Sequence, residues 1–140
     1  MEKKELMTEE MALDELKNWA EDNDLDIFLT DDKGRVVIDN ALLKLAKKMQ
    51  EGVLSINDNK ELEYTVSERS PAGYAGEKLT FKSPDGSAFI ATDKFKEQEG
   101  AHRLLAVASA MTGQDIRWFA KLNHSDYKVV TLVTSFFIGG

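Results

Sequence analysis

The 140 residues are 42% hydrophobic and 31% charged, which is enough apolar material for one folded domain and argues against wholesale disorder. The net charge of -7 would repel phosphate groups, so nucleic acid is a poor candidate partner. Because cysteine is absent, disulfides, thiolate nucleophiles and cysteine-based metal sites are excluded.

The N-terminal part is predicted to form a helix followed by a hairpin. Thr8 can cap a helix that runs to Ala20, since its side chain suits the N-cap and two glutamates follow it. The range 25–39 is predicted to be a β-hairpin. Apolar residues alternate before an acidic, glycine-containing turn at 31–34, and the β-branched run Val36-Val37-Ile38 follows it.

A second helix and a second hairpin are predicted next. The range 40–50 has its apolar residues on one helical face, and Gly52 supplies the residue type that ends helices. Strands at 53–56 and 62–66 should pair across a polar turn, because apolar and polar residues alternate along the second of them.

The loop at 68–77 contains proline and two glycines and is the best candidate for a boundary between subdomains. After it, strands at 78–82 and 88–91 are predicted to form a third hairpin across the turn Ser83-Pro84-Asp85-Gly86. Strands followed by helices favour the α+β class, with a small antiparallel sheet built from hairpins. We expect one domain over 1–140, with a mixed helix and hairpin part at 1–91 and a helical part at 92–140.

The last third is predicted to contain three helices joined by capping sequences. The first covers 93–111 and ends before Gly113. The sequence Thr112-Gly113-Gln114-Asp115 resembles a capping box for a short helix through Trp118 and Phe119. Asn123-His124-Ser125-Asp126 repeats that pattern before a final helix at 127–138. This helix is apolar on nearly every face, so it must be buried in its own core or in a partner.

No catalytic, metal or cofactor site is expected. The acidic stretch Asp22–Asp26 fails as a calcium loop, because Ile27 and Lys33 stand where glycine and glutamate are needed. His102 and His124 lack further ligands for zinc, and adjacent Ser125 and Asp126 cannot line up as a triad. An enzyme is therefore the least expected class.

The last third resembles the tail assembly chaperones of long-tailed bacteriophages, mainly over residues 92–138. Those proteins often carry a leucine or methionine before Thr-Gly, then a leucine, an aspartate with a hydrophobic neighbour, and a phenylalanine. The matching residues are Met111, Thr112, Gly113, Leu122, Asp126, Tyr127 and Phe136. Residues 1–91 have no match to the short strand pair with which many family members begin.

The resemblance implies a small soluble protein of the bacterial host cytoplasm. It would bind the apolar, helical tape measure protein while tail tube protein assembles around that client, and it could be a homo-oligomer. Neither nucleic acid nor a membrane is an expected partner. The charged N-terminus shows no signal peptide, and the apolar run at 129–138 is far shorter than the ~20 residues of a membrane span.

We expect six apolar side chains to contact the client or to support the residues that do. They are Trp118, Phe119, Leu132, Val133, Phe136 and Phe137. The competing interpretation is that the same residues are ordinary core. Two other functions stay open, a structural virion protein of the tail-completion or neck type and an acidic inhibitor or immunity protein.

Overall fold

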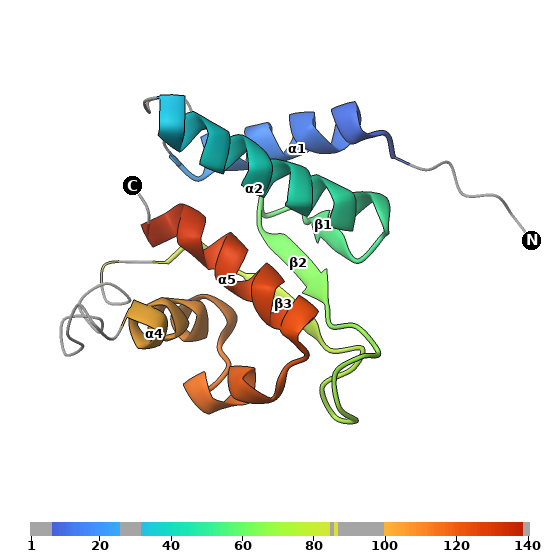
Figure 1. Ribbon diagram of the computed structural model, residues 1–140, viewed down its shortest axis with the longest axis vertical. Helices are drawn as coiled ribbons and strands as arrows, with labels where there is room; N and C mark the ends of the chain where they lie inside the picture. The colour runs from blue at the N-terminus through green and yellow to red at the C-terminus, as the bar shows by residue number, and fades with distance from the viewer. Residues whose placement is uncertain (1–6, 26–31, 85, 87–99, 139–140) are drawn as a thin grey trace, which may run out of the picture. The chain divides into compact units, whose positions relative to one another are not determined.

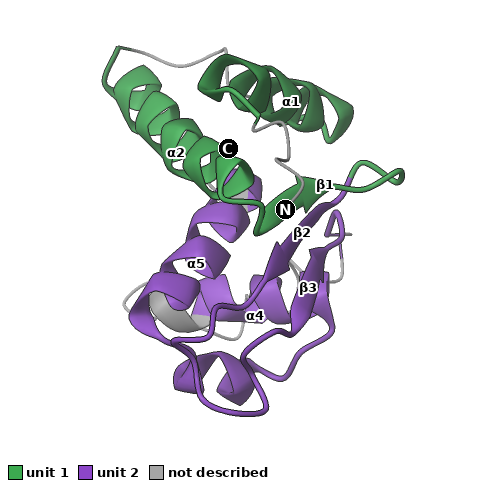
Figure 2. Ribbon diagram, turned by 90° about the vertical axis from the view of Figure 1, so that its right-hand side faces the viewer, with its two compact units in different colours: residues 1–60 green, residues 61–140 purple. Residues whose placement is uncertain are grey.

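The structure is a computed structural model that describes residues 7–25, 32–84, 86 and 100–138. These residues form helices and a small antiparallel sheet, so the predicted α+β class is confirmed (Figure 1). The chain divides into two compact units, residues 1–60 and 61–140 (Figure 2). The loop at 68–77 therefore lies inside the second unit, and each unit is described by itself.

Unit 1 begins with helix α1 (Glu9–Asp22), where the predicted N-cap is confirmed. Thr8 has an extended backbone, and its Oγ1 accepts a hydrogen bond of 3.1 Å from the backbone N–H of Met11. This bond satisfies one of the donors that the first helical turn leaves open. The residues of α1 that face the core recur at helical spacing: Ala12, Leu16, Trp19 and Ala20.

Helix α2 (Asp32–Gln50) replaces the hairpin predicted at 25–39, so that prediction is wrong for 32–39; residues 26–31 lie outside the described part. The helix begins eight residues before the predicted range, and its buried apolar face lies in its second half. That face contains Leu42, Leu45, Ala46 and Met49. The β-branched run at 36–38 is thus helical in spite of its strand preference, and Val36 and Val37 are exposed. Gly52, at φ +83°, follows the end of the helix as predicted.

Strand β1 (Leu54–Ile56) closes unit 1 together with the turn that follows it. The side-chain oxygen of Asn57 accepts a hydrogen bond of 2.9 Å from the N–H of Asn59. The side-chain amide of Asn23 donates to the carbonyl oxygens of Trp19 at 2.8 Å and Lys60 at 3.1 Å. One asparagine therefore ties the C-terminal end of α1 to the turn at 57–60.

Unit 2 is built on strands β2 (Leu62–Thr65) and β3 (Lys78–Phe81), which pair antiparallel. Leu62 lies opposite Phe81, and Tyr64 lies opposite Leu79; all four are buried. The strands predicted at 62–66 and 78–82 are confirmed within one residue. The strand predicted at 88–91 lies outside the described residues.

In the described residues of unit 2, three helices follow the strands: α4 (Gly100–Thr112), the 3-10 helix η3 (Ile116–Lys121) and α5 (His124–Ile138). Helix α4 contacts β3, η3 and α5, and it ends at Gly113, whose φ is +80°. The start predicted at Asp93 lies outside the described residues. No helix in the described part of the chain is long and apolar enough to cross a membrane.

The capping box predicted at 112–115 is wrong in its first residue. Thr112 is the last residue of α4, and its Oγ1 donates to the carbonyl oxygen of Ala108 at 2.8 Å. Asp115 is the N-cap of η3 instead, because its carboxylate accepts from the N–H of Arg117 at 2.8 Å. That bond holds the pKa of Asp115 below its ordinary value.

Candidate protein-binding surfaces

The six predicted contact residues fall into two groups in unit 2. Phe119 and Val133 have no exposed surface, so each can only support a binding surface from the core. The other four are half-buried and keep part of their side chains at the surface. They are Trp118, Leu132, Phe136 and Phe137. The structure therefore divides the predicted set into core positions and surface positions.

Helix α5 has a polar outer face, which the sequence analysis underestimated. His124, Lys128 and Ser135 are exposed on that face. The opposite face is buried and includes Val129, Val130, Val133 and Thr134. Leu132 and Phe136 are four residues apart, so they lie together along one edge between the two faces. We call this pair the α5 edge.

Trp118 presents a second half-buried aromatic surface on η3. Its ring centroid lies 5.0 Å from that of Tyr74, with a tilt of 48°, and 5.5 Å from that of Phe119 in an edge-on arrangement. Trp118 therefore stacks between a residue of the 68–77 loop and a residue of the core. Sequence reasoning missed Tyr74, because a tyrosine in a polar loop carries no periodic signal.

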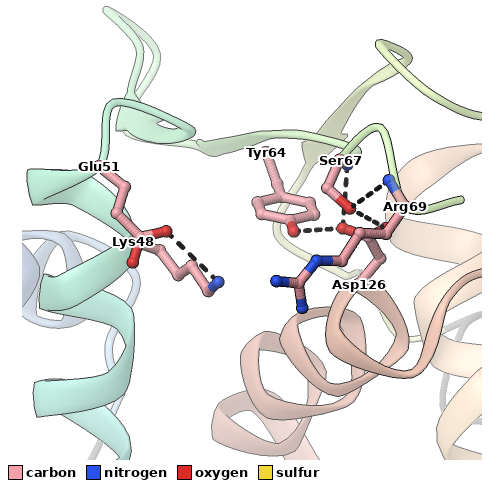
Figure 3. A network of polar contacts seen from close by, with 6 residues as sticks. All are labelled: Lys48, Glu51, Tyr64, Ser67, Arg69 and Asp126. Atoms are coloured by element: carbon pink, nitrogen blue, oxygen red, sulfur yellow. Dashed lines mark hydrogen bonds and ion pairs between the residues drawn. The ribbon is translucent and has the colours of Figure 1, made fainter.

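Asp126 accepts four hydrogen bonds in a polar cluster, of which Figure 3 shows the contacts with Tyr64 and Ser67. Its side chain is completely buried. Oδ1 accepts hydrogen bonds from Tyr64 Oη at 2.5 Å and from the N–H of Ser67 at 3.0 Å. Oδ2 accepts from Ser67 Oγ at 2.8 Å and from Ser70 Oγ at 2.6 Å. Ser70 Oγ in turn accepts from the N–H of Asn123 at 2.8 Å.

Burial alone would raise the pKa of Asp126, but the hydrogen bonds from Ser70, Tyr64 and Ser67 outweigh that effect and hold the pKa below its ordinary value. The carboxylate is therefore charged and its two oxygens share four donors. It fastens the first turn of α5 to β2 and to the loop that follows β2. Such an arrangement suits an anchor and leaves no free oxygen for proton transfer.

Asp126 does not complete the predicted capping box at 123–126. Asn123 caps α5 as expected, since its Oδ1 accepts from the N–H of Ser125 at 3.0 Å. The carboxylate of Asp126 points instead to residues 56 to 62 positions earlier in the chain. His124 is exposed, so it does not join this buried cluster. The described residues contain no group of three His, Cys, Asp or Glu side chains placed to hold a metal ion.

Unit 1 carries the most exposed large apolar side chains of the described chain. On α2 these are Val36 at 59%, Val37 at 68% and Leu43 at 40% exposure. Met11 on α1 is 54% exposed. None of these four residues was predicted as a contact residue, because the hairpin interpretation gave Val36 and Val37 a different environment.

A shallow polar cleft of about 310 Å³ also lies within unit 1. It is lined by Glu15, Asn18, Trp19, Asp22, Ile56, Asn57, Asp58 and Lys60. Its carboxylates, on Glu15, Asp22 and Asp58, are solvent-exposed. The cleft therefore offers weak electrostatic attraction for a cation and no catalytic arrangement.

Comparison with known proteins gives no relative: no family model, no curated protein and no solved structure matches the chain. The interpretation of function therefore rests on the sequence pattern of the last third and on the surfaces described above. Four of the six predicted contact residues are half-buried apolar residues of unit 2.

Proposed function

We propose that this protein is a bacteriophage tail assembly chaperone without enzymatic activity. In the cytoplasm of the bacterial host it binds the apolar tape measure protein and keeps that client soluble while tail tube protein assembles around it. The proposal joins the sequence pattern at 111–136 to the half-buried apolar residues on the same stretch of chain.

The observation that carries the proposal is the α5 edge together with Trp118. Leu132 and Phe136 lie one helical turn apart, and Trp118 exposes part of an indole ring that Tyr74 and Phe119 hold in place. Apolar surface of this kind binds by non-directional burial, and an amphipathic helix can lay its apolar face against it. Phe119 and Val133 would support this surface from beneath.

The charge balance is compatible with a coat for an apolar client. The chain has 25 acidic and 18 basic residues, so complexes that carry several copies would repel one another. The same charge disfavours nucleic acid as a partner. A chaperone needs this combination of an apolar contact surface and a repulsive exterior, because the client alone would aggregate.

The test is co-expression with the tape measure protein of the same phage, with the soluble fraction of that client as the readout. Leu132→Asp and Phe136→Asp place a charge on the α5 edge and should reduce the soluble client to the level seen without chaperone. Ser135→Asp is the matched control, since it adds the same charge to the exposed face of the same helix. It should leave client solubility unchanged.

Circular dichroism of each purified variant separates loss of binding from loss of folding. The proposal fails if the folded edge variants solubilise the client as well as the wild type does. It also fails if the wild-type chain has no effect on the client. In the second case, incorporation into purified virions would indicate a structural tail or neck component.

A further inference from the structure

The outer face of α2 has the repeat of a short two-stranded coiled coil. Val36 and Leu43 are seven residues apart and both are exposed, so they lie above one another on the solvent side of the helix. Asn40 is exposed between them. The inner face of the same helix is occupied by the core of unit 1, so the two faces are independent.

These positions fit a heptad in which Val36 and Leu43 take position d and Asn40 takes position a. Asp39 then falls at position g, and Lys44 falls at position e of the next heptad. Both charged residues are exposed. We call Val36, Val37, Asp39, Asn40, Leu43 and Lys44 the α2 stripe.

We propose that the α2 stripe is a homodimer interface, in which the α2 helices of two copies pack in parallel and in register. The d positions would bury Val36 against Val36 and Leu43 against Leu43 of the second copy. Val37 at position e would add apolar surface along one side. The proposal is independent of the chaperone function, because it uses residues of unit 1 and needs no client.

Charge complementarity favours a second copy in parallel orientation. In a parallel pair, residue g of one helix faces residue e five positions later on the other, so Asp39 faces Lys44 of the second copy twice by symmetry. Asp39 also pairs with Arg35 of its own helix at 3.8 Å, but that exposed contact is compatible with a second partner.

Asn40 supports the same arrangement and register. A single asparagine at position a pairs with its symmetry mate in a parallel dimer and specifies two strands at a cost in affinity. Lys33 and Lys47 occupy the neighbouring a positions, and Ala46 is buried in the unit's own core. The stripe spans only the nine residues from Val36 to Lys44, little more than one heptad, so the dimer should be weak and reversible.

The first test is sedimentation equilibrium of the full chain over a wide concentration range. The wild-type mass should rise from 15.7 kDa towards twice that value with concentration. Asp39→Lys and Lys44→Asp should each weaken association roughly tenfold, because two attractive pairs become repulsive. The double variant D39K/K44D should recover the wild-type dissociation constant. Asp14→Lys, an exposed reversal on α1, is the control and should have a small effect.

The second test uses the absence of native cysteine. Asn40→Cys places one thiol at the two-fold axis of a parallel dimer, so it should form a disulfide-linked dimer at least tenfold faster than the exposed control Asp14→Cys. A chain that stays monomeric at millimolar concentration would overturn the proposal. Charge reversals that the double variant does not rescue would also overturn it, as would equal cross-linking rates at positions 40 and 14.

Discussion

Replacing Asp126 by alanine should lower the stability of unit 2 more than any other change of a polar side chain described above. The substitution removes the acceptor of four hydrogen bonds. Tyr64 and Ser70 are buried, so their hydroxyl groups would lose their acceptor at a place that water does not reach. The two donors on Ser67 are half-buried and can turn to solvent.

The size of the effect follows from those two buried donors. A buried donor without an acceptor costs about 1–3 kcal/mol, so Tyr64 and Ser70 together account for a loss of about 2–6 kcal/mol. Asp126→Asn should cost less, about 1–2 kcal/mol, because its carbonyl oxygen still accepts from Tyr64 while the serine hydroxyls can accept from its amide. Tyr64→Phe removes one donor and should fall in the same range as the asparagine variant.

Guanidinium-induced unfolding, followed by tryptophan fluorescence, measures these differences. The chain has two tryptophans, one in each unit, so a Trp19→Phe background leaves Trp118 as the reporter of unit 2. A double-mutant cycle between Tyr64→Phe and Asp126→Ala isolates the bond between the two side chains. A loss below about 0.5 kcal/mol for Asp126→Ala, the size of an ordinary surface change, would refute the anchoring role.

The pH dependence of the stability of unit 2 is an independent test of the charged state of Asp126. Hydrogen bonds hold the pKa of Asp126 lower in the folded than in the unfolded chain. Its contribution is therefore fully present above the unfolded pKa of about 4 and is lost as pH falls through the lower folded value. The stability difference between wild type and Asp126→Asn should be constant near neutral pH and should shrink below about pH 4. A difference that grows on acidification would contradict the charged state assigned to this carboxylate.

Five further substitutions test the local features. Thr8→Ala should lower stability by about 1 kcal/mol in thermal unfolding, through loss of the N-cap bond to the first turn of α1. Gly113→Ala should lower stability by about 1 kcal/mol, because alanine disfavours the positive φ at this position. The added methyl group meets no neighbour within 4 Å, so no steric clash adds to this loss. Gly113→Asn should lower stability less. Phe119→Ala should cost about 3–5 kcal/mol in denaturant unfolding, and Trp118→Ala should cost clearly less because its ring is half-exposed.

The sequence predicts helix ends well where the determining contact is local. Thr8 and Met11 are three residues apart, and Asn123 and Ser125 are two apart, so both caps can be read from neighbouring residues. Gly113 ends α4 for the same kind of reason. Strand β2 was located by its alternation and β3 by the turn that follows it. The partner of β3 was not located, because pairing depends on residues far away in the chain.

Asp126 shows the limit of predictions made from neighbouring residues alone. Its position three residues after Asn123 fits a capping box, so the sequence predicts a hydrogen bond back to the helix N-terminus. In the structure the side chain has other, stronger partners instead. Tyr64, Ser67 and Ser70 supply them from 56 to 62 residues earlier, and no spacing rule connects those positions. The buried carboxylate needs these partners, because a charge can be buried only when it is paired or hydrogen-bonded.

The run Val36-Val37-Ile38 led to the wrong prediction of a hairpin at 25–39. The same run contributes Val36 and Val37 to the proposed interface. Read alone, three β-branched residues after an acidic turn favour a strand, and the helix prediction then begins only at 40. Once α2 is known to start at Asp32, Val36 and Leu43 fall on one outer face and Asp39 and Lys44 on its two sides. The sequence did not predict this spacing on one helical face, because residues 36–38 were predicted to form a strand, in which side chains repeat every two residues and not every three and a half. In the proposed dimer, Val36 and Leu43 would be buried against a second copy of α2.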